Sequence, residues 1–142
     1  FSAINRNYTY RILNRFSPSA LYKNRYWWVT KQLNLDIMKK EANSLIGTHD
    51  FTSFRSQGCQ SKSPVKTVNS IEFKKDGDFI LLNISARSFL YNQVRIIIGT
   101  LKELGEGKFA DNNLYSIISK KDRKFAGVTA PPQGLTLMSV DY

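Results

Sequence analysis

Arg95 is the residue of this sequence with the clearest potential for charge-based chemistry. It lies in the stretch RSFLYNQVRIIIGTLKELGEGK, residues 87–108, directly before three isoleucines in a pattern typical of a buried helix. A guanidinium stays charged at any accessible pH, so burying it without a partner would cost several kcal/mol. Either Arg95 extends to solvent or a negative group binds it. The helical pattern alone favours extension to solvent.

Other residue types that commonly carry out chemistry are scarce. His49 is the only histidine and Cys59 the only cysteine, so neither a metal site nor an intramolecular disulfide is expected. A lone histidine beside Asp50 is more often a hydrogen-bonding loop residue than a catalyst. The GEGK segment at 105–108 lacks the strand before it and the helix after it that a phosphate-binding loop requires. The single cysteine favours a reducing compartment, and we expect a cytoplasmic protein.

The chain is strongly basic. It carries 21 lysines and arginines against 11 aspartates and glutamates, a net charge of +10. Such a charge favours nucleic acid as the partner, with an acidic membrane surface or plain solubility as alternatives. The membrane alternative is weak because no predicted helix pairs a basic face with a large aromatic one.

Two segments combine basic and aromatic residues: YKNRYWW at 22–28, with Arg25, and FTSFRSQGCQSKSPVKT at 51–67, with Arg55 and Lys62. Basic side chains can neutralise phosphates and aromatic rings can stack on unpaired bases. These segments therefore predict RNA-binding loops. The alternative is that the rings pack into the core and the loops are simply solvated.

The strands that would position these residues follow from alternation and turn signals. Residues 6–13 alternate as a strand, and Asp76-Gly77 predicts the turn of a hairpin between 68–75 and 78–86. The second hairpin strand is apolar on both faces, which indicates a central position in its sheet. A final strand is predicted at 135–140. The segments 14–30 and 48–67 are predicted as loops.

Three helices are predicted. The first begins after an N-cap at Asn34 and ends at Gly47, with an apolar stripe formed by Leu35, Met38, Ala42, Leu45 and Ile46. The second runs over 90–104 with Gly105 as its C-cap, and the third covers 111–121. Gly99 costs the second helix about 1 kcal/mol relative to alanine, which predicts that another backbone passes close to it. The expected fold is α+β: a mostly antiparallel sheet with helices packed on one face.

Three motifs occur in a particular order: HDFTSF at 49–54, VRIIIGTL at 94–101 followed by GEGK, and AGVTAPPQGLTL at 126–137. In order and spacing they resemble the C-terminal half of the TruA-type tRNA pseudouridine synthases, over essentially the whole chain. The resemblance implies that residues 1–142 form half of a pseudouridine synthase fold. It also implies an enzyme that isomerises uridine to pseudouridine in the anticodon stem-loop of tRNA. Such an enzyme uses no cofactor or metal, flips the base out of its stack and forms a homodimer.

The resemblance assigns roles to individual residues. Tyr8 matches the tyrosine that stacks on the flipped base, and Arg95 matches the basic residue that pairs with a catalytic aspartate and orients it. Leu137, with Leu135 as the nearby alternative, occupies the apolar wall of the pocket. Asn92 stands where many family members carry histidine, a difference that we expect to be tolerated. The enzymatic interpretation requires Tyr8, Arg95 and Leu137 to converge on one cleft.

Arg55, Lys62 and Arg25 are the expected substrate-binding residues outside the pocket. The first two belong to the loop that resembles the RNA-facing surface of the family, and the third to the other basic-aromatic segment. A non-catalytic RNA-binding module that uses these same loops is the alternative function.

The catalytic aspartate of the family is not found in this sequence. The family places it in a GRTDxGVHA-like motif of the N-terminal half, and no aspartate here has that context: Asp36, Asp50, Asp76, Asp78, Asp111, Asp122 and Asp141. The chain also begins with Phe1 rather than methionine. We therefore expect a piece of a longer polypeptide that supplies the nucleophile, and an inactive chain on its own.

Overall fold

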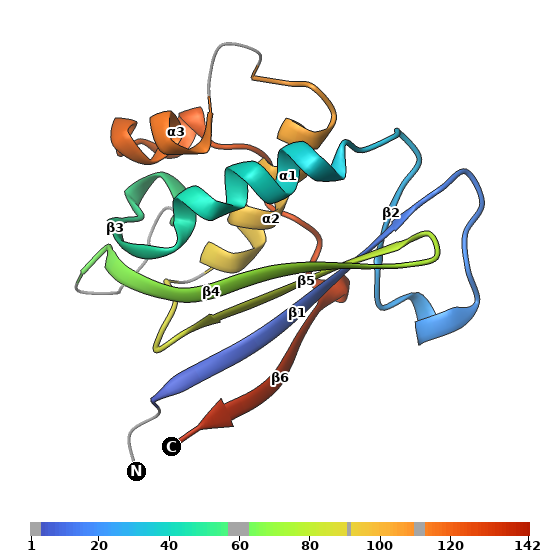
Figure 1. Ribbon diagram of the computed structural model, residues 1–142, viewed down its shortest axis with the longest axis horizontal. Helices are drawn as coiled ribbons and strands as arrows, with labels where there is room; N and C mark the ends of the chain where they lie inside the picture. The colour runs from blue at the N-terminus through green and yellow to red at the C-terminus, as the bar shows by residue number, and fades with distance from the viewer. Residues whose placement is uncertain (1–3, 57–62, 91, 110–112) are drawn as a thin grey trace.

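The computed structural model describes residues 4–56, 63–90, 92–109 and 113–142. Within these residues the strands are β1 (Asn5–Asn14), β2 (Trp27–Val29), β3 (Gly47–Asp50), β4 (Val65–Asp76), β5 (Phe79–Ala86) and β6 (Leu135–Asp141). The α-helices are α1 (Leu35–Ala42), α2 (Gln93–Gly105) and α3 (Leu114–Lys120), and short 3-10 turns occur in several of the connections between elements. All three helices lie on one face of the sheet (Figure 1).

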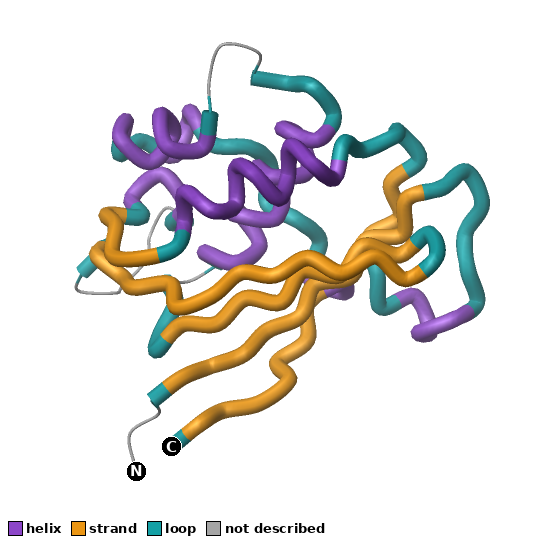
Figure 2. The backbone as a smooth tube through the Cα atoms, viewed as in Figure 1, coloured by secondary structure: helices purple, strands orange, loops and turns teal. Residues whose placement is uncertain are grey.

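The sheet has the order β2-β1-β5-β4-β3, and β6 pairs with β1 on the same edge as β2. The β1–β2 pair is parallel and the other pairs are antiparallel. Figure 2 shows α1, α2 and α3 gathered as one layer above the sheet. The predicted α+β class, with a mostly antiparallel sheet and helices on one face, is confirmed.

The predicted hairpin is confirmed at Asp76-Gly77. Gly77 has a φ of +59°, which favours glycine because it lacks a Cβ. β5 pairs with β4 on one side and with β1 on the other, so it is central, as its apolar character on both faces predicted. Leu82 and Ile84 are each 2% exposed. β1 is therefore held along its length by a buried neighbour.

The two segments predicted as loops contain strands. β2 lies within 14–30, and β3 occupies Gly47–Asp50, at the start of 48–67, where β4 also begins. Both new strands are short, and each forms through pairing with a distant strand: Trp27 with Ile12 in β2, and Gly47 with Val68 in β3. Local sequence patterns carry little information about such strands because tertiary pairing stabilises them. His49 accordingly lies on a strand, not in a loop, with Nε2 3.0 Å from the Ile46 carbonyl oxygen.

The first and third helices are shorter than predicted. The N-cap at Asn34 is confirmed, since its side chain accepts a hydrogen bond from the Ile37 amide. α1 ends at Ala42 and a 3-10 turn follows, so the assignment of Ile46 to the apolar stripe is wrong and its side chain is 44% exposed. α3 begins at Leu114, and residues 110–112 of the prediction lie outside the described residues.

The second helix forms the centre of the core. Ile96, Ile97 and Ile98 are 0–1% exposed, and α2 begins at Gln93, after Asn92 in a left-handed conformation. The prediction placed the start three residues earlier, at Leu90. The difference matters because this end of α2 carries Arg95.

Candidate active site

A pocket of about 400 Å³ opens where β1, the start of β6 and the N-terminal end of α2 meet. The lining includes Arg6, Tyr8, Phe89, Gln93, Arg95 and Leu135. Tyr8, Arg95 and Leu135, predicted from segments far apart in the sequence, therefore share one pocket. Leu137 pairs with Tyr8 across the β1–β6 ladder but does not line the pocket, and its side chain is 48% exposed.

β1 places two tyrosines on the same face of the sheet, because side chains alternate along a strand. The half-buried Tyr8 ring packs edge-on against Phe89, with 5.5 Å between ring centroids. Tyr10 is 1% exposed and its hydroxyl donates to the Pro131 carbonyl oxygen at 2.7 Å. Burial raises the pKa of Tyr10, although the nearby Arg95 charge opposes that shift. Tyr10 thus remains a structural hydrogen-bond donor, while Tyr8 presents its ring to the pocket.

Arg95 is half-buried and held by two neutral acceptors. Its Nε donates to the Ala130 carbonyl oxygen at 2.7 Å, and one terminal nitrogen, Nη1, donates to Asn92 Oδ1 at 2.9 Å. Within the described part of the chain, no carboxylate forms an ion pair with it. The guanidinium is therefore oriented without being neutralised. Such a group can receive a negative partner from outside these residues.

The segment 127–130, which we call the strap, crosses α2 at Gly99 and fixes the acceptor for Arg95. A Cβ atom added at Gly99 would lie 1.7 Å from the Val128 carbonyl oxygen. The predicted close approach of another backbone is therefore confirmed. The Ala130 amide donates to the Arg95 carbonyl oxygen at 2.9 Å, so strap and helix hold each other at the arginine.

Thr100 attaches the strap to the helix interior. Its buried hydroxyl donates to the Ile96 carbonyl oxygen at 2.8 Å and accepts from the Gly127 amide at 2.9 Å. We predict that Thr100→Val lowers the free energy of unfolding by about 1–3 kcal/mol, because the Gly127 amide is left buried without an acceptor. Urea denaturation followed by tryptophan fluorescence measures this change. Thr100→Ser keeps the hydroxyl and is the control; equal destabilisation by both variants would contradict the role of the hydrogen bond.

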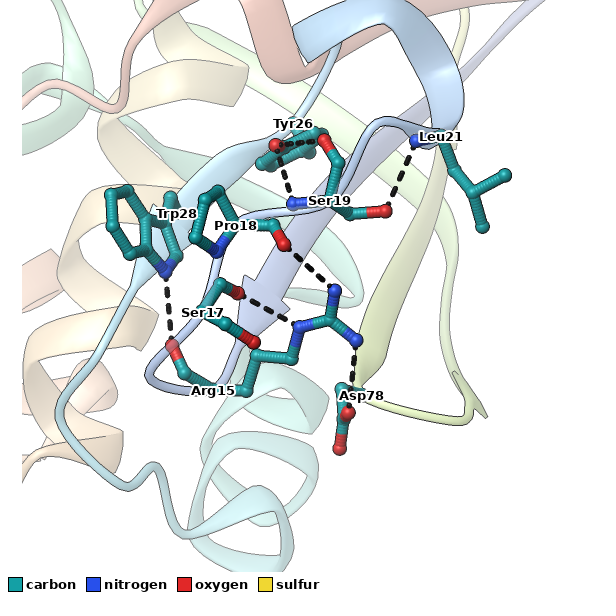
Figure 3. Close-up of polar contacts among 8 residues, drawn as sticks. All are labelled: Arg15, Ser17, Pro18, Ser19, Leu21, Tyr26, Trp28 and Asp78. Atoms are coloured by element: carbon teal, nitrogen blue, oxygen red, sulfur yellow. Dashed lines mark hydrogen bonds and ion pairs between the residues drawn. The ribbon is translucent and has the colours of Figure 1, made fainter.

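Arg25 lies away from the pocket, on the connection between β1 and β2. This connection is fixed by its own hydrogen bonds: Arg15 binds the Ser17 and Pro18 carbonyl oxygens, and the Tyr26 hydroxyl binds Ser19 (Figure 3). Tyr8 is six residues before the end of β1, so the connection begins about 20 Å from the tyrosine. Arg25 itself is exposed, and any contact it makes with RNA is separate from the pocket.

The other two predicted substrate-binding residues lie in the β3–β4 connection. Arg55 is half-buried and follows the 3-10 turn Thr52–Phe54, outside the lining of the pocket. Lys62 and Cys59 lie outside the described residues. Phe51 and Phe54 are fully buried, so these two rings belong to the core, as the alternative interpretation of this segment proposed.

Sequence reasoning assigned no function to two residues of the site, Asn92 and Gln93. Asn92 lines the pocket with a φ of +59° and contacts Arg95. Gln93 is fully buried; its Oε1 accepts from the Leu90 amide at 2.7 Å, and its Nε2 has no hydrogen-bond partner among the described residues. Asn92 was noted only because many family members carry histidine there, and Gln93, the first residue of α2, had no distinguishing signal in the sequence.

The described residues offer neither a metal-binding cluster nor a membrane-spanning helix. No group of three or more histidine, cysteine, aspartate or glutamate side chains is placed to hold a metal ion. No helix there has the length and apolar character needed to cross a membrane.

Tyr8, Arg95 and Leu135 thus bring an aromatic ring, a positive charge and an apolar side chain together at one pocket of an α+β domain. The chain belongs to the tRNA pseudouridine synthase family, whose sequence profile matches residues 42–142. It is 48% identical over its full 142 residues to tRNA pseudouridine synthase A of Bartonella quintana (strain Toulouse). It is 49% identical over the same length to the protein of that name from Brucella ovis. The chain covers 58% and 57% of these two relatives, respectively.

Proposed function

We propose that this chain is the C-terminal part of a tRNA pseudouridine synthase that modifies uridine in the anticodon stem-loop of tRNA. The family membership and the two relatives support the reaction, and the resemblance of the motifs supports the anticodon arm. The proposal includes a cytoplasmic homodimer that uses no metal or cofactor. The nucleophilic aspartate comes from polypeptide outside these 142 residues.

The reaction exchanges one bond of the nucleoside for another. The bond between N1 of uracil and C1′ of the ribose breaks with help from the aspartate carboxylate, and the freed uracil turns. A bond then forms between C5 and C1′, the hydrogen on C5 leaves as a proton to solvent, and N1 takes up a proton, so the product is an isomer of the substrate. Tyr8 stacks on the flipped base, and Leu135 supplies an apolar wall beside it. Arg95 keeps the aspartate ionised and oriented, because a nearby positive charge lowers the pKa of a carboxylate.

The observation that carries the proposal is the state of Arg95. A half-buried guanidinium faces the same pocket as Tyr8 and has only neutral hydrogen-bond acceptors among the described residues. Removing a charge from water without neutralising it is unfavourable. A half-buried guanidinium with neutral acceptors is therefore expected where a negative group binds it in the complete site. A carboxylate from the remainder of the enzyme is that group.

Binding of the tRNA outside the pocket is assigned to the basic surface. The chain carries a net charge of +10, and Arg25, Arg55 and Lys62 are proposed to contact the phosphate backbone. Affinity for tRNA should therefore fall steeply as the salt concentration rises. A non-catalytic RNA-binding module would show the same salt dependence, so binding alone does not separate the two functions.

A measurement of turnover distinguishes the synthase from the non-catalytic RNA-binding module. We predict that the full-length protein releases tritium from tRNA carrying tritium at C5 of its uridines, and that the 142-residue chain alone releases none. Salt-dependent tRNA binding by the full-length protein without tritium release would favour the non-catalytic module. Release by the chain alone would show that the nucleophile lies within these residues.

A further inference from the structure

Asn92 joins Arg95 to a second segment of the chain. Its Oδ1 accepts from Arg95 Nη1 at 2.9 Å, and its Nδ2 donates to the Ser56 hydroxyl at 3.0 Å. Because a guanidinium can only donate hydrogen bonds, the oxygen of the Asn92 amide must face Arg95 and the nitrogen must face Ser56. Both ends of the side chain are therefore used, and its orientation is determined.

The backbone of Asn92 has an unusual conformation. Its φ of +59° lies in the left-handed region, which costs an ordinary residue about 1–2 kcal/mol and which asparagine tolerates better than most. The strained residue stands between the pocket-lining segment 88–90 and the first turn of α2. Strain of this kind persists where the surrounding structure requires a particular geometry.

We propose that Asn92 is a positioning residue that orients the Arg95 guanidinium for its partner carboxylate. Nε is held by the Ala130 carbonyl and Nη1 by Asn92, so two points on different nitrogens determine the plane of the guanidinium. No other described residue is hydrogen-bonded to Nη2 or to the second hydrogen of Nη1, and these groups can bind a carboxylate through both of its oxygens. The inference rests on the proposed function, since it takes Arg95 as the partner of the catalytic aspartate.

A neutral amide performs this task better than a carboxylate at the same position. The amide oxygen fixes the guanidinium and leaves its full positive charge for the incoming aspartate. An aspartate at position 92 would accept the same hydrogen bond but would neutralise Arg95 and compete for it. It would also lose the donor that binds the Ser56 hydroxyl.

The experiment compares variants of the full-length protein by tritium release from tRNA labelled at C5 of uridine. Asn92→Gly removes both hydrogen bonds, and because glycine accepts the left-handed backbone, the relief of strain offsets part of the stability lost with them. We expect kcat to fall about ten- to a hundredfold, the effect of losing one hydrogen bond to a charged group. KM for tRNA should change less than about threefold, because Asn92 acts on the reacting geometry and not on RNA binding.

Asn92→Asp is the second variant, and it keeps the size of the side chain and tolerance of the left-handed backbone. We expect its kcat to fall further than that of Asn92→Gly, because the new carboxylate pairs with Arg95. The control is Lys121→Gly, which also replaces a left-handed residue at a helix end (φ +49°) but lies outside the pocket lining. Its kcat should equal that of the unchanged protein.

The inference is overturned if Asn92→Gly and Asn92→Asp both keep kcat within about twofold of the unchanged protein. It is also overturned if the losses appear only in KM, or if Lys121→Gly loses kcat to the same extent. These outcomes leave the proposed function intact, because they require an active unchanged protein. Absence of tritium release by the unchanged full-length protein contradicts the proposed function itself.

Discussion

Replacing Arg95 with alanine in the full-length protein is expected to lower kcat about a thousandfold, the size of effect seen when one preorganised electrostatic group is removed from an active site. The affinity for tRNA should change less than about threefold, because a pocket residue that acts on the aspartate contributes little to binding the RNA backbone. Tritium release measures kcat, and a salt-controlled binding titration measures the affinity. Equal losses of turnover and affinity would instead identify Arg95 as a phosphate contact.

Arg95→Lys tests whether charge alone is sufficient. A lysine ammonium keeps the positive charge but has no planar fork, so it cannot bind the Ala130 carbonyl, the Asn92 amide and a carboxylate in one fixed plane. We expect a loss of kcat between those of the unchanged protein and Arg95→Ala. Full activity of the lysine variant would show that the geometry described for this site is unimportant.

Arg6 offers a matched control within the same pocket. It is also an arginine on the lining, but its guanidinium donates to the Arg87 carbonyl oxygen at 2.5 Å in an exposed position. Arg6→Ala removes one positive charge from the pocket without removing the arginine held at Ala130. Its effect on kcat should be far smaller than that of Arg95→Ala. A similar loss in both variants would assign the effect to the general positive potential of the pocket.

Much of the fold could be predicted because its main elements carry strong local signals. The hairpin turn at Asp76-Gly77, the N-cap at Asn34 and the apolar helix around 96–98 each depend on residues close together in sequence. β2 and β3 could not be predicted, since three- and four-residue strands form only when a distant strand is available for pairing. The early end of α1 has the same origin: β3 starts at Gly47 and pairs with β4.

For the candidate site, the sequence predicted several of the residues but not the contacts between them. The resemblance of motifs brought Tyr8, Arg95 and the 135–137 segment to notice, and the pocket contains Tyr8, Arg95 and Leu135. The helical pattern around Arg95 favoured extension to solvent, whereas its guanidinium is held by Ala130 and Asn92. Those contacts depend on a strap 35 residues away and on a left-handed backbone conformation at Asn92. Neither leaves a periodic signal in the sequence.

Gly99 was recognisable from the sequence as a glycine inside a predicted helix. Its replacement is the second of the two substitutions with the largest expected effects. We predict that Gly99→Ala lowers the free energy of unfolding by about 3 kcal/mol, the upper part of the range for inserting a methyl group into a packed interior. The added Cβ would lie 1.7 Å from the Val128 carbonyl oxygen and 3.3 Å from the Ala130 amide nitrogen. These are backbone atoms, so the strap as a whole must move. Chemical denaturation of the full-length protein measures the change.

Gly105→Ala on the same helix is the control that isolates the contact with the strap. Gly99 lies in the interior of α2, where alanine is favoured over glycine by about 1 kcal/mol, whereas Gly105 is the last residue of the helix, so helix propensity cannot explain a larger loss of stability at Gly99. The new Cβ at Gly105 would meet Met38 Sδ at 2.7 Å and Cγ at 2.9 Å; this side chain is buried, but an unbranched thioether can change its rotamer where a backbone carbonyl cannot move alone. We therefore expect Gly105→Ala to leave stability within about 1 kcal/mol of the unchanged protein.

Gly99→Ala should also lower kcat, because the strap carries the carbonyl oxygen that accepts a hydrogen bond from Arg95. If Gly99→Ala displaces residues 127–130, the Ala130 carbonyl leaves Arg95 Nε and the Ala130 amide leaves the Arg95 carbonyl oxygen. We expect kcat measured under conditions where the variant remains folded to fall about tenfold or more, as for the loss of a charge-assisted hydrogen bond. A destabilised variant with unchanged kcat would show that the strap supports the fold but not the orientation of the arginine.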